Sequence, residues 1–465
     1  MTAISSPTIP TTTIKVLKFG GSSVGSPEAL RRAAGILAEE LPGGGLVVVS
    51  ALKGTTDGLL AAVDAAARGD LREARRIQED LRRRHDHAAH ALGLLAEVDA
   101  PFEDGFERLA SLLAGMAMLG EATARARDAA LAVGETLSAR LLTALLRSQG
   151  RPARFEEAGT VLKTDGRHGQ ARPLPPATLR RAAEPWRRGI EAGALLVTQG
   201  FLGAGPEGAV TTLGRGGSDT SATLLGEALG AAEVQIWTDV DGVLSADPGL
   251  VPEARPLPVL SLAEATALSA FGAKVLHADS LAPLARAGFR LLVANTLRPE
   301  ASRTLILPEA PLRAPGEVTS VAYKEGLALL RLPPGARLEE LLALASELEE
   351  LGARRFGLLA NPEGALLALR PETPQAEARL AALEASGADL QRGWAVVALV
   401  GEGLRQDPCA ALRLLAAVQD EPLGGLLTGS SGVSVAFLLP ERRLAAVIPH
   451  LHSASLAGTG ARRTA

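Results

Sequence analysis

The sequence is poor in cysteine, in long hydrophobic runs and in excess charge of either sign, and each absence excludes a class of protein. Cys409 is the only cysteine, so an internal disulfide and a cysteine-built zinc site are both excluded. The net charge is −4, from 48 basic against 52 acidic residues, which excludes a broadly basic surface for nucleic acid. No uncharged apolar run reaches the roughly 18 residues of a membrane span. Residues 1–13 form a polar tail unlike a signal peptide, so we expect a cytoplasmic protein.

Short apolar runs alternate with helical stretches up to about residue 300. Strands are expected at 14–19, 46–50, 194–201, 208–213, 233–240 and 289–294, and helices at 57–68, 71–95, 105–131, 135–149, 218–230, 261–270 and 279–287. The alternation predicts an α/β fold over 14–307, with a largely parallel central sheet and helices on both faces. The stretch 71–131, rich in Arg, Glu, Ala and Leu, is expected to be a helical insertion packed on the side of the sheet.

The sequence pattern changes near residue 300, where prolines occur at 299, 308, 311 and 315. We expect a linker over 308–317. Shorter strand and helix patterns follow it. They predict two small α+β units, one over 318–390 and one over 391–465.

The segment Lys18-Phe19-Gly20-Gly21 ends the first expected strand and precedes a helix start at Ser26-Pro27. Ligands of open α/β sheets bind beyond such strand ends, where glycine lets the backbone approach a phosphate and lysine adds a positive charge. A tight turn with a surface lysine explains the same residues, so both interpretations stay open. The chain has no G-x-x-x-x-G-K-[ST] loop.

A second segment, at 211–222, places Arg215 among three glycines, directly before Ser218-Asp219-Thr220. As structure alone it is a glycine loop with a helix cap. Arginine in such a loop is poorly placed for packing and well placed to clamp a carboxylate, so we favour a functional role. Asp219, in the first turn of the helix, could cap it, align lysines or hold Mg²⁺.

Three other segments carry weaker patterns. The segment 237–243 (WTDVDGV) suits a nucleotide base or ribose, or simply an Asp-Gly turn. The G-x-G-x-x-G spacing at 203–208 precedes a strand and contains Pro206, so it predicts a hairpin loop. His85, His87 and His90 favour a solvated helix face over a metal site.

Taken together, these segments resemble the aspartokinases of the amino-acid kinase family. The resemblance covers most of residues 14–307. It is carried by KFGGSSVGS at 18–26, VVVSALKGTTDGLL at 47–60, GETLSARLL at 134–142, TQGF at 198–201, TTLGRGGSDTSA at 211–222, WTDVDGV at 237–243 and FGAKVLH at 271–277. The two C-terminal units look like the paired ACT domains that this family uses for feedback control.

The resemblance implies transfer of the ATP γ-phosphoryl group to the β-carboxylate of L-aspartate, with Mg²⁺, as the first step toward lysine, threonine and methionine. It implies catalytic roles for Lys18 and Asp219. It implies nucleotide contacts from Lys18, Phe19, Gly20, Gly21, Thr238, Asp239 and Lys274, and no protein-held metal. It implies aspartate contacts from Ser50, Thr56, Glu135 (to the ammonium), Phe201, Arg215 (to the α-carboxylate), Gly216, Gly217 and Ser218.

Two departures from the family pattern lie near the expected nucleotide site. Leu244 stands where the family often has tyrosine, and Gly249 where it often has arginine, which leaves nucleotide affinity open. They also motivate an alternative, an amino-acid sensor with a degenerate kinase domain. A kinase for glutamate or acetylglutamate is a further alternative. A lysine or threonine effector at the ACT units and a homodimer or larger assembly are expected from the resemblance.

Overall fold

The computed structural model describes residues 13–272, 276–309, 312–332, 335, 337–361, 364–428 and 432–460. Contacts divide the chain into two compact units. The first comprises Met1–Val243, Pro258–Leu262 and Val275–Glu309, and the second comprises Leu244–Leu257, Ala263–Lys274 and Ala310–Ala465. The C-terminal unit therefore also draws on two segments from the region before residue 300.

The first unit is built on one eight-stranded sheet. Its strands follow the order β3 (Ala153–Glu156), β4 (Leu195–Gln199), β2 (Gly45–Val49), β1 (Lys15–Phe19), β7 (Glu233–Thr238), β9 (Arg290–Asn295), β10 (Thr304–Leu307) and β8 (Val259–Ser261). All neighbours are parallel except β9 and β10. A separate hairpin joins β5 (Leu202–Ala204) and β6 (Val210–Thr212). The predicted hairpin at 203–208 is therefore present, with residues 203–204 in β5 and the rest in the loop.

Helices cover both faces of this sheet, because its central strands are apolar on both sides. Leu17, Phe19 and Val49 pack into a core with α2 (Pro27–Glu40) and α6 (Ala124–Ser148). Val234 points the other way, against α8 (Gly217–Leu229). The helices α7 (Pro176–Glu191) and α10 (Ala278–Ala287) pack beside α8. The predicted parallel sheet with helices on both faces is confirmed.

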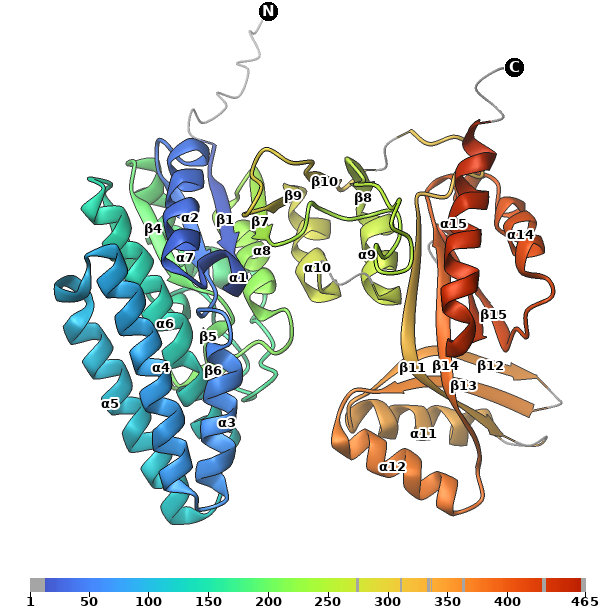
Figure 1. The fold of residues 1–465 in the computed structure, drawn as a ribbon, viewed down its shortest axis with the longest axis horizontal. Coiled ribbons are helices and arrows are strands. Elements are labelled where there is room, and N and C mark those ends of the chain that lie inside the picture. The colour runs from blue at the N-terminus through green and yellow to red at the C-terminus, as the bar shows by residue number, and fades with distance from the viewer. Residues whose placement is uncertain are drawn as a thin grey trace, which may run out of the picture. The chain divides into compact units, whose positions relative to one another are not determined.

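The expected insertion forms part of a helical bundle (Figure 1). The helices α3 (Thr55–Ala67), α4 (Leu71–Leu92), α5 (Leu95–Leu119) and α6 pack on one another. The insertion helices α4 and α5 rest mainly on α3 and α6, which corrects the expectation that they lie on the side of the sheet. Of the described helices, α6 alone has the length and apolar composition of a membrane span, and 78% of that window is buried inside the protein.

The helix break expected between residues 131 and 135 is wrong, because the chain turns earlier. Gly120 adopts φ 71° and ends α5, and the Thr123 hydroxyl accepts a hydrogen bond from the Ala126 N–H to cap α6. Gly134 lies inside α6 instead. A Cβ there would come within 2.9 Å of the Thr55 side chain, so glycine serves close packing at this point.

The three histidines of α4 do not share one face. His85 is buried with its ring edge-on to Phe102 and Phe106, and burial lowers its pKa to about 4. His87 and His90 are exposed. The expected solvated face therefore holds for two of them, while His85 belongs to the core of the bundle.

The second unit is built on one antiparallel sheet. Its order is β12 (Ala353–Asn361), β13 (Gly364–Pro371), β11 (Ser320–Leu332), β14 (Asp389–Val400), β16 (Ser434–Pro440) and β15 (Gly425–Thr428). Its helices are α9 (Leu262–Phe271, whose first residue counts with the first unit), α11 (Leu338–Glu350), α12 (Pro374–Ala385), α13 (Gly403–Gln406), α14 (Cys409–Leu415) and α15 (Leu444–Gly460).

Two separate hydrophobic cores divide this unit, as expected of two small α+β modules. One contains Leu330, Ala345 and Leu369, and the other contains Phe437 and Ile448. The long strands β11 and β14 contribute to both cores. The boundary expected after residue 390 consequently lies inside β14.

Candidate active site

A cleft of about 390 Å³ opens where β1, β2 and β4 end in the first unit. These strands are parallel neighbours, so their carboxyl ends meet at one edge of the sheet. Most of the predicted site residues line this cleft: Lys18, Gly21, Ser50, Thr56, Glu135, Phe201, Gly216, Gly217, Ser218 and Asp219. The structure therefore brings together residues that lie up to two hundred positions apart in the sequence.

Lys18 supplies a buried positive charge to the cleft. It is the next-to-last residue of β1, paired in register with Val48 and Ile236, and only 8% of its surface is exposed. Its ammonium forms an ion pair with the carboxylate of Asp219, in the first turn of α8. A buried cation needs such a partner, and the pairing also fixes where the ammonium points.

Of the two glycines after β1, Gly21 lines the cleft and Gly20 does not. The Gly20 N–H donates to the Trp237 carbonyl, 3.1 Å away, and the short helix α1 (Gly21–Val24) follows. A Cβ on Gly21 would lie 3.1 Å from the carbonyl oxygen of Ala51, so the turn is packed tightly against the loop after β2. The ends of β1, β2 and β7 are thus held together by backbone contacts.

Glu135 supplies a buried carboxylate. It projects from α6, is 3% exposed, and its Oε2 has no hydrogen-bond partner among the described residues. Burial raises the pKa of Glu135 to about 8, although hydrogen bonds from backbone N–H groups, that of Ala51 included, oppose the rise. A carboxylate of this kind at a cleft wall favours a cationic ligand, whose charge would offset the cost of burial.

The glycine loop, residues 213–217, contributes Gly214, Gly216 and Gly217 to the wall of the cleft. Gly214 and Gly216 have φ of 77° and 67°, values that favour glycine. A Cβ on Gly217 would lie 2.5 Å from the Phe201 ring, and Phe201 is itself the one non-glycine residue with positive φ in the described part of the chain. Close packing, together with backbone conformation, therefore requires glycine here.

The N-terminus of α8 begins in this loop. No side chain caps it, and Gly216, Gly217 and Ser218 line the cleft. The first N–H groups of a helix carry a partial positive charge that attracts anions. With Lys18, this terminus makes one part of the cleft suitable for phosphate, while Glu135 makes another part suitable for an ammonium group.

Several predicted residues lie elsewhere. Arg215 is exposed and does not line the cleft, although both of its glycine neighbours do. The Phe19 ring is fully buried and stacks on Trp237 at 6.2 Å, so only its backbone could reach a ligand. Thr238 ends β7 and Asp239 follows it, at the same edge of the sheet but outside the lining of the cleft. Lys274 lies outside the described residues.

Two polar residues of the cleft were not predicted. Lys53 and Asp57 both line it, and both are exposed. Their position in the sequence could have predicted them. Both lie within the segment VVVSALKGTTDGLL, and Lys53 follows the end of β2 by only four residues. A lysine just beyond a strand end in a chain with few lysines was a candidate on the same grounds as Lys18.

Comparison with known proteins identifies the family to which this chain is similar. The profile of the amino acid kinase family matches residues 13–295. Lysine-sensitive aspartokinase 3 of Escherichia coli K12 is 30% identical over 462 residues, covering 95% of this chain and 98% of its own. Chloroplastic aspartokinase 1 of Arabidopsis thaliana is 36% identical over 350 residues, or 72% of this chain. The chain spans about 60% of the length of the chloroplastic relatives that it matches.

Two solved structures have a fold similar to that of this chain. The crystal structure of E. coli aspartokinase III in complex with lysine and aspartate aligns with a TM-score of 0.80 at 28% identity, covering 95% of this chain and 99% of its own. The structure of the same enzyme in complex with aspartate and ADP aligns with a TM-score of 0.77 at 28% identity and the same coverage.

Proposed function

The chain belongs to the amino acid kinase family and, within it, to the aspartokinases, and from this membership and the cleft we propose that it phosphorylates L-aspartate. The γ-phosphoryl group of ATP would pass to the β-carboxylate, giving ADP and 4-phospho-L-aspartate. In metabolism this would be the first step toward lysine, threonine and methionine.

The observation that carries the proposal is the pairing of opposite charges in one cleft. Glu135 offers a buried carboxylate whose Oε2 has no hydrogen-bond partner among the described residues, and Lys18 with the N-terminus of α8 offers positive potential. A substrate that carries an ammonium group and a second group that reacts with a phosphate fits both parts of the cleft. Aspartate has these groups, and E. coli aspartokinase III was crystallised with aspartate and ADP.

The reaction needs positioning and charge screening more than proton transfer. A free aspartate side chain, with a pKa of about 3.9, is already ionised at neutral pH. One of its β-carboxylate oxygens attacks the γ-phosphorus, the bond from that phosphorus to the β,γ-bridging oxygen breaks, and ADP leaves. Both reactants are anions. Lys18, held by Asp219, and the N–H groups of α8 would lower their mutual repulsion and stabilise the transferred group.

Other residues would hold the two substrates. Ser50 and Thr56 lie in the cleft wall where aspartate would bind, and Arg215 would clamp its α-carboxylate. Thr238, Asp239 and Lys274 would contact the nucleotide. No cluster of three metal-ligating side chains occurs in the described part of the chain, and Mg²⁺ would enter with the phosphates of ATP.

The second unit would supply regulation. It is built as two small α+β modules, and the name and crystal structure of the E. coli relative describe sensitivity to lysine and binding of lysine. We propose lysine or threonine as effector, a homodimer or larger assembly, and the cytoplasm as the compartment where ATP and free amino acids meet.

A hydroxamate assay tests the function. The protein is incubated with Mg-ATP, hydroxylamine and either aspartate or glutamate, and the coloured acyl-hydroxamate is measured. Product with aspartate alone supports the proposal. Product with glutamate alone would indicate a glutamate kinase. Absence of turnover, with aspartate or lysine binding seen by calorimetry, would indicate an amino-acid sensor.

A further inference from the structure

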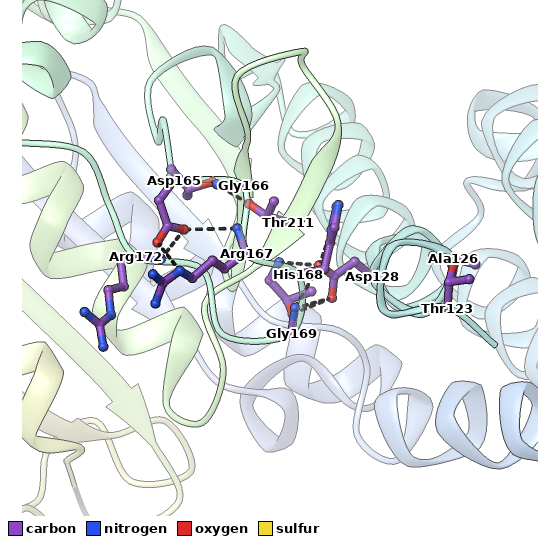
Figure 2. A network of polar contacts seen from close by, with 12 residues as sticks. Thr123, Ala126, Asp128, Asp165, Gly166, Arg167, His168, Gly169, Arg172 and Thr211 are labelled. Carbon is purple, nitrogen blue, oxygen red and sulfur yellow. Dashed lines mark hydrogen bonds and ion pairs between the residues drawn. The ribbon is translucent and has the colours of Figure 1, made fainter. Parts of the chain in front are cut away.

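Asp128 is a buried carboxylate that the proposed reaction does not use. It lies on α6, with 1% of its side chain exposed. Its oxygens accept hydrogen bonds from the Gly169 N–H at 3.1 and 3.0 Å, from the Thr212 N–H at 3.2 Å and from the Thr212 hydroxyl at 2.7 Å. The His168 Nδ1 lies 2.8 Å away. Figure 2 shows Asp128 reaching from its helix to His168 and Gly169.

These contacts join α6 to two segments that are distant in sequence. One is the loop over residues 165–172, and the other is the end of β6. The two segments also bond to each other, since the Ala171 N–H donates to the Thr212 carbonyl at 2.9 Å. A carboxylate that is removed from water needs donors in fixed positions, so the burial of Asp128 constrains where Thr212 can lie.

Thr212 is the residue directly before the glycine loop at 213–217. Glycine restricts the backbone least, and this loop contains three glycines, of which Gly214 and Gly216 have positive φ. Few side chains can therefore hold it in place. Its C-terminal end is fixed by α8. Its N-terminal end is held by Thr212, which pairs with β5 and bonds to Asp128, and by the Leu213 N–H, which donates to the Phe201 carbonyl at 2.9 Å.

The same helix carries Glu135, seven residues after Asp128. Seven residues are about two turns, or roughly 10 Å along one helix face. A single rigid element thus sets the distance between the carboxylate expected to bind an ammonium group and the loop expected to bind a carboxylate. An α-amino acid must satisfy both groups at once, so an error in this distance weakens its binding.

We propose that Asp128 is a positioning residue for the amino-acid substrate, which holds the glycine loop at the correct distance from Glu135. The proposal rests on the proposed function for its substrate and on the hydrogen bonds above for its geometry. It predicts a larger effect on the amino acid than on the nucleotide. The end of the loop that carries the phosphate-facing N–H groups belongs to α8, and no hydrogen bond or ion pair in the described part of the chain joins Lys18 to Asp128.

The test compares Asp128→Asn with Asp165→Asn. The first variant keeps the shape but turns an N–H donor toward the N–H groups of Gly169 or Thr212. We expect the KM for aspartate to rise about tenfold or more, with a clearly smaller rise in the KM for ATP. Asp165 caps the same loop through Arg167 and Arg172 without touching Thr212, so its variant should keep the wild-type KM for aspartate.

A double-mutant cycle strengthens the comparison. Thr212→Val removes the hydroxyl donor alone and should also raise the KM for aspartate. Because the two residues act through one contact, the double variant should be little worse than Asp128→Asn by itself. If Asp128→Asn fails to fold, Thr212→Val gives the same readout with a smaller disturbance. Wild-type KM for aspartate in both single variants, or a parallel rise in both KM values, would overturn the proposal.

Hydrogen exchange provides a readout without any substrate. Amides of residues 212–217 should exchange faster in Asp128→Asn than in wild type or in Asp165→Asn. Unchanged exchange would overturn the role of Asp128 as an anchor. If the wild-type protein phosphorylates no aspartate, the proposed function fails, while faster exchange in Asp128→Asn still supports the anchor.

Discussion

Replacing Glu135 with glutamine should stabilise the substrate-free protein and abolish productive aspartate binding. Burial raises the pKa of Glu135 from 4.5 to about 8. At 1.36 kcal/mol per pH unit, ionising this group costs about 5 kcal/mol more in the folded than in the unfolded chain. A raised pKa means that the wild type has its full stability below pH 4.5 and loses it progressively as the pH rises through 8. Glutamine does not titrate, so the variant avoids this loss.

The stability of the variant relative to wild type should therefore increase by about 5 kcal/mol between pH 4.5 and pH 8 and stay level above that. Burying the glutamine amide costs about 1–2 kcal/mol at every pH. This cost lowers the stability of the variant relative to wild type by a constant amount and does not change how that difference varies with pH. Urea unfolding across this pH range measures it. In a Trp394→Phe background, Trp186 and Trp237 report on the first unit alone.

Aspartate provides the second half of this test. Its ammonium group should raise the unfolding midpoint of the wild type at pH 8 and leave that of Glu135→Gln unchanged. A stability difference that does not vary with pH would contradict the buried, unpaired state of Glu135. Equal stabilisation of both proteins by aspartate would contradict its role in binding.

Three other predictions concern the remaining groups. Lys18→Ala should lower kcat about 10²–10³-fold in the hydroxamate assay, because it removes a cation from the transition state, and near-normal turnover would remove Lys18 from the mechanism. Arg215→Ala should raise the KM for aspartate about tenfold or more, whereas an effect on the KM for ATP alone would mean that it serves the nucleotide. Lysine or threonine at about 100 times its Kd should stabilise the protein by about 2.7 kcal/mol in a thermal-shift assay, and no shift with either would exclude both as effectors.

Much of the site could be predicted from the sequence, because its residues lie at the ends of expected strands. The runs that became β1, β2 and β4 are largely buried and have apolar centres, and Lys18, Ser50 and Phe201 come near or just after their last residues. Because parallel strands share one carboxyl edge, residues at three such ends had to gather. The glycine loop was also visible, since an arginine among three glycines is poorly placed for packing.

Features that depend on tertiary packing were not predictable in this way. The sequence pattern put a helix start at Glu135, directly after Gly134, whereas the structure uses that glycine for close contact inside α6. The burial of Glu135, and with it the high pKa, follows from this packing. Asp128 gave no signal either, because its partners come from a loop and a short strand that contact it only in the fold.

The elements that were missed have local reasons. The helix α7 begins at Pro176 and contains Pro185, and proline usually argues against a helix interior. The strands β3, β8 and β10 have only three or four residues each, too few for a periodic pattern. They gain their stability from the neighbouring strands of the sheet.

The central claim is that a carboxylate oxygen of aspartate attacks the γ-phosphorus within this cleft. Aspartate labelled with ¹⁸O in its β-carboxylate tests it directly, with hydroxylamine added to cleave the acyl phosphate at its carbonyl carbon. The bridging oxygen then leaves with the phosphate. The account predicts inorganic phosphate that carries one ¹⁸O atom, as measured by ³¹P NMR or mass spectrometry, and phosphate without label would contradict it.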